Sequence, residues 1–185
     1  MRVFIAARTL GEASSWRLTN LQMQKILYVA HMLHMGRTGS RLIDELFEAW
    51  EFGPVLPSLY RFAKSNKNGF INPFSHVETF VEGSLERCAV EDALALTRHL
   101  SASELIRLTH RAGGAWDRLY EPGLMSISIP DHEILTEFHS HMIASQDAVS
   151  WAEKMADEIE AAPSRYLDSE RKRAFRARVL SGCLQ

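Results

Sequence analysis

Glu48-Ala49-Trp50-Glu51-Phe52-Gly53-Pro54-Val55 is the stretch of sequence on which the interpretation of the fold depends. It places two large aromatic side chains, Trp50 and Phe52, beside a glycine–proline pair, and each ring can bury a large apolar surface. Gly53 permits a backbone conformation that a Cβ would forbid, although Pro54 favours extended geometry for the residue before it. Pro54 itself suits the first turn of a helix. We therefore expect a helix that ends near Trp50, a tight corner, and a second helix shortly after it.

The segment before this corner predicts a central helix, which begins at Thr19 and runs to about Met35. Thr19 is followed three residues later by Gln22, which is the capping-box pattern. Apolar residues cover nearly all faces of this helix, and that distribution is typical of a buried helix. Lys25 lies within it, and an unpaired buried ammonium group is very costly. We therefore expect Lys25 to have an acidic or a carbonyl partner.

The remaining pattern predicts a mainly α fold, a compact single-domain helical bundle with a helical C-terminal extension. Ser101 and Glu104 form a second capping-box pattern, and Gly113-Gly114 is expected to end the helix that follows it. One or two short strands are expected around 70–81 and 126–129. The first stretch mixes β-branched and aromatic residues, and an irregular loop is its alternative; the second alternates polar and apolar residues. The further helices are expected at 2–13, 42–50, 56–63, 85–100, 101–111, 115–120 and 130–144.

The last part of the chain differs in character, and we expect a domain at 1–140 and a helical extension at 141–185. An acidic helix is expected at 148–160 and a basic helix at 168–180. The basic run could contact nucleic acid or a membrane surface. Asp168 and Glu170 interrupt that run, however, and the net charge of the chain is −2. Charge therefore argues against a nucleic-acid partner.

Composition sets the broad class of protein. The chain has 185 residues, of which 46% are hydrophobic and 24% charged, so it can bury a sizeable core. No apolar run approaches the roughly 18 residues of a membrane span, and we expect no membrane association. Cys88 and Cys183 have no metal-like spacing and suggest no disulfide framework. The expected location is the cytoplasm.

Histidine offers two hypotheses for a chemical site. His31 and His34 are three residues apart on a predicted helix, a spacing that can bring two metal ligands onto one face. Thr109-His110, followed by Trp116, is a second cluster with the composition of a site. Its alternative is a helix C-terminus at which His110 bonds the last carbonyls and Trp116 packs beneath it.

Sequence motifs of catalysis and cofactor binding are absent. There is no Gly-x-Ser-x-Gly motif, and no glycine-rich loop leads from a strand into a helix. We therefore predict no catalytic residue, no cofactor and no metal. A small hydrolase or metal enzyme built on His110 stays open as an alternative.

Three blocks of sequence resemble one known family. Leu18-Thr19-Asn20-Leu21-Gln22-Met23-Gln24-Lys25-Ile26-Leu27-Tyr28-Val29-Ala30 resembles the opening motif of the Panacea domain, the SocA-like antitoxin family that also occurs in phage-associated GepA-like proteins. Ala49 to Val55, with Tyr60 after it, is similar to the family's tryptophan-x-tyrosine-glycine-proline-valine signature, with Phe52 in place of the tyrosine. Leu108-Thr109-His110, followed by Trp116, resembles the third block.

The resemblance implies a non-enzymatic antitoxin of a toxin–antitoxin system, which neutralises a toxin encoded beside it by direct protein–protein binding. It does not identify that toxin. An adaptor that delivers a partner to a protease is an alternative, and homo-oligomerisation stays open. Exposed aromatics such as Phe52 and Tyr60 suit a protein interface, although core packing explains each of them equally well. The residues that the resemblance singles out as scaffold or partner-binding are Gln24, Lys25, Tyr28, Trp50, Phe52, Gly53, Pro54, Val55, Tyr60, Thr109, His110 and Trp116.

Overall fold

The computed structural model describes residues 2–65, 74, 76–124 and 126–143. The helices of these residues are α1 (Arg2–Ala13), α2 (Asn20–Thr38), α3 (Pro57–Ser65), α4 (Leu85–Thr97), α5 (Ala102–Thr109), α6 (Ala115–Leu119) and α7 (Asp131–Ile143). The strands are β1 (Phe47–Trp50), β2 (Gly53–Val55) and β3 (Ser128–Ile129), which form one antiparallel sheet in the order β2-β1-β3. The prediction of a mainly helical fold is confirmed.

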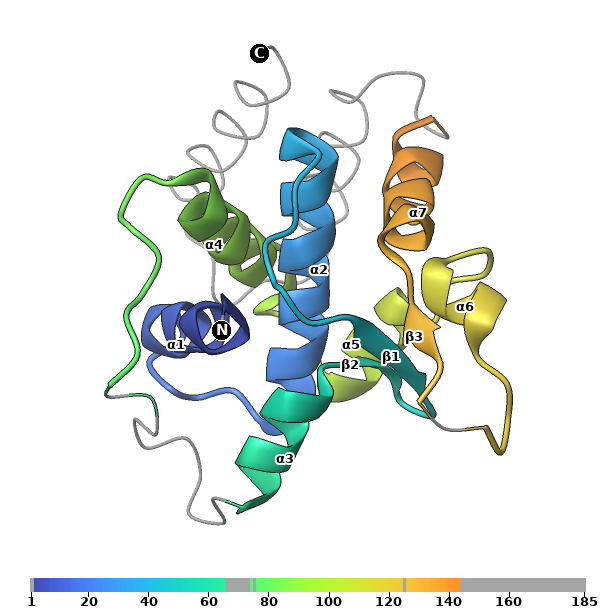
Figure 1. The fold of residues 1–185 in the computed structure, drawn as a ribbon, viewed down its shortest axis with the longest axis horizontal. Coiled ribbons are helices and arrows are strands. Elements are labelled where there is room, and N and C mark those ends of the chain that lie inside the picture. Colours follow the sequence, from blue (N-terminus) through green and yellow to red (C-terminus); the bar gives the residue numbers. More distant parts are fainter. Residues whose placement is uncertain (1, 66–73, 75, 125, 144–185) are drawn as a thin grey trace.

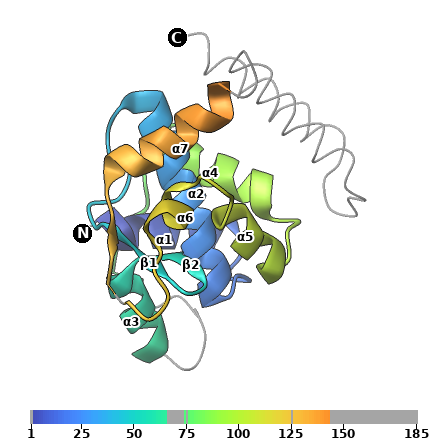
Figure 2. The ribbon, with the colours of Figure 1, turned by 90° about the vertical axis from the view of Figure 1, so that its right-hand side faces the viewer.

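Helix α2 is the centre of the fold. Helices α1 and α4 lie on one side of it and α6 and α7 on the other, while the sheet lies beside its N-terminal half (Figure 1). Figure 2 shows α7 crossing α2, and the ring of Phe138 occupies the place that a Cβ at Gly36 would take. Residues 23–35 of α2 are all buried, as the apolar pattern predicts.

The start of α2 follows the predicted capping box. Thr19 accepts a hydrogen bond from the backbone N–H of Gln22, and the Gln22 side chain accepts one from the backbone of Thr19. The helix runs three residues beyond the predicted end at Met35, and Gly39 closes it with a φ of 68°. A left-handed residue of this kind is a common helix terminator.

The helix predicted at 42–50 is wrong, because β1 occupies its second half. Glu48 pairs with Val55, and Trp50 pairs with Gly53, so the predicted corner between two helices is a β-hairpin. Pro54 lies within β2, and Pro57 is the residue that opens α3. The physical reason lies in α2, whose buried polar side chains bond the backbone of this segment at Ile43, Pro54 and Leu56.

Most other predicted elements agree with the structure. The helices predicted at 2–13, 56–63, 115–120 and 130–144 correspond to α1, α3, α6 and α7, and those at 85–100 and 101–111 end two or three residues early. The strand predicted at 126–129 is β3. Residues 74 and 76–81 form no strand, and the rest of that predicted stretch lies outside the described residues, as do the helices predicted at 148–160 and 168–180.

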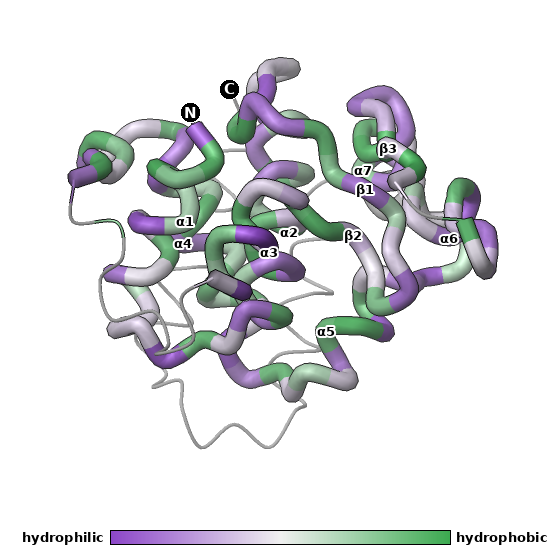
Figure 3. The backbone as a smooth tube through the Cα atoms, turned by 60° about the horizontal axis from the view of Figure 1, so that its bottom comes forward, coloured by the Kyte–Doolittle hydropathy of each residue, from purple (hydrophilic) through white to green (hydrophobic). Residues whose placement is uncertain are grey.

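Hydrophobic residues lie where elements of the fold contact one another. Hydrophobic residues of α5 lie next to β2 (Figure 3). Within the described ranges, no helix combines the length and the apolar character that crossing a membrane requires.

Candidate functional site: the hairpin held by α2

Two adjacent side chains of α2 hold strand β2 and the residue after it. The Gln24 side chain bonds both backbone groups of Leu56, accepting from its N–H at 2.8 Å and donating to its carbonyl at 3.5 Å. Lys25 donates from Nζ to the carbonyl of Pro54 at 2.8 Å. The expectation that Lys25 has a carbonyl or acidic partner is confirmed, and the partner is a carbonyl.

The Lys25 amine lies in an unusual environment for a lysine. The residue is 1% exposed, and burial lowers its pKa from 10.5 to about 7. Desolvation disfavours the charged form of a buried lysine. The hairpin is therefore held by an amine whose charge changes near neutral pH.

Gly53 is the point at which the three sequence blocks meet. Its φ is +97°, a conformation that L side chains rarely adopt, and a Cβ built there would lie 2.8 Å from Thr109 Oγ1. The same Cβ would lie 2.9 Å from Lys25 Nζ and 3.1 Å from His110 Nε2. Glycine is thus required twice, for the backbone and for the space.

His110 ends α5 and lies against an aromatic stack. Its backbone N–H donates to the carbonyl of Ile106 at 2.9 Å, and its ring stacks on Trp116 with 3.5 Å between centroids. Trp116 stacks in turn on Tyr120 at 4.5 Å. The prediction of a helix C-terminus with Trp116 packed beneath His110 is confirmed. Burial and the nearby Lys25 charge lower the pKa of His110, and a hydrogen bond to the Phe52 backbone opposes this shift.

Trp116 also connects α6 to the hairpin. Its indole Nε1–H donates to the carbonyl of Trp50 at 2.8 Å. Thr109, the other member of the third block, donates its hydroxyl to the carbonyl of Leu105 at 3.1 Å, within its own helix. The Thr109 hydroxyl and the Trp116 indole N–H therefore bond backbone carbonyls, and the His110 and Trp116 rings pack on each other.

Glu137 is a member of this network that the sequence interpretation missed. Its Oε2 accepts a hydrogen bond from the Tyr28 hydroxyl at 2.6 Å and one from the backbone N–H of Ala115 at 2.9 Å. It thereby joins α7 to α2 and to the start of α6. Burial and the Glu137 carboxylate raise the pKa of Tyr28 well above 10.0. The signal in the sequence was an acidic residue beside Ile134 and Phe138 on the apolar face of a predicted helix.

The side chains on the outer face of the hairpin are more accessible. Trp50 is half-buried, donates from Nε1 to Glu48 Oε2 at 2.8 Å, and meets the Tyr60 ring edge-on with 4.8 Å between centroids. Phe52, at the tip, is 58% exposed, so the expectation that it could bury a large surface within this chain is not met. Val55 is buried opposite Glu48.

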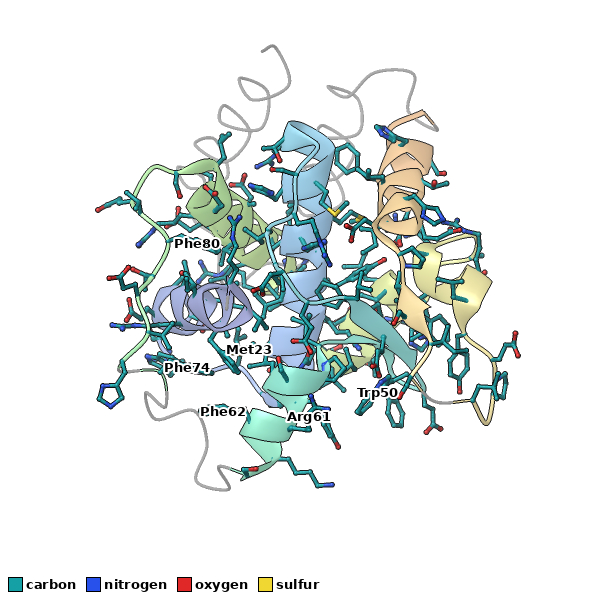
Figure 4. All side chains as sticks on the ribbon, viewed as in Figure 1. Met23, Trp50, Arg61, Phe62, Phe74 and Phe80 are labelled. Carbon is teal, nitrogen blue, oxygen red and sulfur yellow. The ribbon has the colours of Figure 1, made fainter. Side chains whose placement is uncertain are left out.

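The twelve predicted residues therefore fall into two groups. The larger group packs around the hairpin, and all of its members are buried except the half-buried His110: Gln24, Lys25, Tyr28, Gly53, Pro54, Val55, Thr109, His110 and Trp116. Trp50, Phe52 and Tyr60 lie on the outer face (Figure 4 labels Trp50).

His31 and His34 bond backbone groups and do not converge on a shared point. His31 Nδ1 accepts from the N–H of Ile43 at 3.2 Å, and His34 Nδ1 lies 3.0 Å from the carbonyl of Ser40. Burial lowers the pKa of His31 to about 3. Throughout the part of the chain that the structure describes, no three histidine, cysteine or acidic side chains are grouped as metal ligands.

Comparisons with known proteins agree with one another. A family model described as "Antitoxin SocA-like, Panacea domain" matches residues 23–117, which contain the twelve predicted residues from Gln24 to Trp116 but not the first five residues of the opening block, Leu18 to Gln22. The chain is 30% identical to the protein named Antitoxin SocA from Caulobacter vibrioides strain NA1000 / CB15N over 160 residues, covering 79% of this chain and 83% of that relative. No solved structure matches. This chain belongs to the SocA-like antitoxin family and carries its Panacea domain.

Proposed function

We propose that this chain is the antitoxin of a toxin–antitoxin pair and that it neutralises a neighbouring-gene toxin by binding it directly. Membership of a family whose model and whose relative both carry the name antitoxin supports this proposal. The observation that carries it is the packing of family residues against the hairpin: Lys25, Thr109 and His110 converge on Gly53, and Lys25 donates to the carbonyl of Pro54. Such residues maintain a rigid scaffold, and the binding specificity then belongs to the exposed surface.

The same geometry supports a binding role over a hydrolytic one. A nucleophilic hydroxyl needs a neighbouring base that can accept its proton. The Thr109 hydroxyl donates to the carbonyl of Leu105, and one face of the His110 ring is covered by Trp116 at 3.5 Å. We infer that the chain is not an enzyme.

Co-expression with the product of the adjacent open reading frame tests the proposed function. We expect that product to arrest growth when expressed alone, normal growth when this chain is present, and a stable complex when both are purified together. Growth arrest that persists despite equal amounts of folded chain would contradict the proposal.

A protease-deficient host separates direct neutralisation from delivery to a protease. Direct binding predicts that rescue continues in this host, because the bound toxin is already inactive. Loss of rescue, with toxin accumulating in complex with this chain, would assign the adaptor role instead. His110→Ala addresses the enzyme alternative: a folded variant that still rescues excludes a catalytic His110.

A further inference from the structure

The outer side of the β1–β2 hairpin gathers aromatic and acidic side chains. We call Glu48, Trp50, Glu51, Phe52 and Tyr60 the hairpin face. Glu48 and Trp50 are two residues apart on β1 and are hydrogen-bonded, and Tyr60 of α3 packs on the Trp50 ring. Glu51 and Phe52 form the exposed tip. Tryptophan and tyrosine are enriched among the residues that dominate binding energy at protein interfaces.

The hairpin face is held in place from behind. The carbonyl of Trp50 accepts the Trp116 indole N–H, the carbonyl of Pro54 accepts Lys25, and Leu56 is bonded twice by Gln24. Side chains from two separate helices thus fix a short two-stranded turn. A preorganised surface loses little conformational freedom on binding, and this lowers the entropic cost of association.

The charge of this segment has one sign. From Asp44 to Tyr60 the sequence contains four carboxylates and no lysine, arginine or histidine. Asp44 and Glu45 bond the backbone of Val3 and Ser58, whereas Glu51 is exposed at the hairpin tip beside Phe52. A partner that docks here gains electrostatic attraction if its own surface is basic.

We propose that the hairpin face is the surface that binds the toxin, and that the toxin offers an apolar pocket for Phe52 bordered by lysine or arginine side chains. This inference rests on the proposed function. Phe52 inserts as the anchor, Trp50 and Tyr60 form the rigid aromatic floor beside it, and Glu51 pairs with the basic rim.

A second exposed apolar pair supplies matched controls. Val81 and Leu85 are 76% and 62% exposed, and Glu82 lies between them. They lie beside the start of α4, on the opposite side of the molecule from the hairpin (Figure 1). Both are aliphatic, and the three residues 81, 82 and 85 repeat the apolar and acidic composition of the hairpin tip without its aromatic floor.

The test measures toxin affinity for full-length wild type and four variants. Phe52→Ser and Glu51→Lys alter the hairpin face, and Leu85→Ser and Glu82→Lys make the same chemical changes at the control site. The probe is the purified product of the adjacent open reading frame, and affinity is measured by titration calorimetry at low and high salt. Thermal melts check that each variant is folded.

The expected result is a loss of roughly tenfold or more in affinity for Phe52→Ser, and a similar loss for Glu51→Lys that shrinks at high salt. The control variants should bind as wild type does. The inference would be overturned, with the proposed function intact, if all four variants bound the toxin as tightly as wild type does, or if only Leu85→Ser and Glu82→Lys lost affinity. Failure of wild type itself to bind would refute the proposed function. A change of oligomeric state in Phe52→Ser without toxin would overturn the inference by assigning the face to a second copy of this chain.

Discussion

At the scale of single residues, Gly53 carries the most specific constraint. Its φ of +97° and the three polar atoms around it exclude a Cβ on two separate grounds. Gly39 is a suitable comparison, because its φ of 68° is also left-handed but no atom lies within 4 Å of an added Cβ. The difference between the two positions therefore reports the cost of crowding together with that of the more extreme φ of Gly53.

We predict that Gly53→Ala lowers the free energy of unfolding by about 3 kcal/mol, and Gly39→Ala by about 1 kcal/mol. Chemical denaturation of both variants and wild type measures this difference. Equal losses would show that neither the atoms around Gly53 nor its more extreme φ adds to the cost of a Cβ. The larger Gly53→Val should be worse still, because the second branch has no room.

Lys25 gives the chain a predictable pH dependence. Its pKa is about 7 in the fold and 10.5 for an unperturbed lysine, so the unfolded chain binds more protons between these values. The free energy of unfolding therefore rises with pH from about 7, with a slope of up to about 1.4 kcal/mol per pH unit. We predict that Lys25→Met removes this slope. Denaturant titrations at pH 7, 8 and 9 measure it, and parallel curves for variant and wild type would contradict the prediction.

The sequence predicted some residue-level features and left others open. Burial of Lys25 and its need for a carbonyl or acidic partner follow from the apolar character of its helix. That the acceptor is Pro54 does not follow, because the choice depends on how a hairpin 29 residues later packs on α2. The stacking of His110 on Trp116 was among the expected alternatives, whereas Glu137 was missed because its partners come from two other helices.

At the scale of elements, the segment 40–56 shows how tertiary partners override local preference. Leu42 to Trp50 has helix-forming composition, and an isolated peptide would favour helix on that basis. In the fold, His31, Lys25 and Gln24 bond backbone groups along this segment, and β3 pairs with β1. These partners provide hydrogen bonds for the backbone N–H and C=O groups of the extended segment, so the segment does not need the hydrogen bonds of a helix. Elements with their own caps, such as α2 and α5, were predicted closely.

Glu137 joins helix α7 to α2 and α6 by two hydrogen bonds, and their contribution to stability can be measured. Glu137→Ala would remove Oε2, the oxygen that accepts hydrogen bonds from both the Tyr28 hydroxyl and the Ala115 N–H. We predict a loss of about 3 kcal/mol in the free energy of unfolding, and a smaller loss for Glu137→Gln, which keeps an acceptor oxygen. Glu133→Ala on the same helix removes a more exposed ion pair with Arg118 and should cost under about 1 kcal/mol. Denaturant titrations of the three variants measure these losses, and equal effects at the two positions would refute this account of α7.

At the scale of the whole molecule, the folded unit extends beyond the residues that match the family model. That match covers 23–117, yet Val3, Ala6 and Leu10 of α1 and Ile134 and Phe138 of α7 are all buried in the core. Both helices pack directly on α2. The three sequence blocks therefore identify the centre of the domain, while its limits depend on apolar helices that flank them.

We propose that the independent folding unit is the expected domain 1–140, and truncation tests its limits. A chain ending at residue 145 retains α7 with its Tyr28 and Phe138 contacts, so we expect cooperative unfolding with a Tm within a few degrees of the full chain. A chain reduced to 23–117 loses both flanking helices and uncovers α2 on two sides, and we expect it to aggregate. Calorimetry and size-exclusion chromatography compare the two chains with full length. Aggregation of the 1–145 chain would show that Trp151 and Met155 complete the core, and the domain would then include the C-terminal segment.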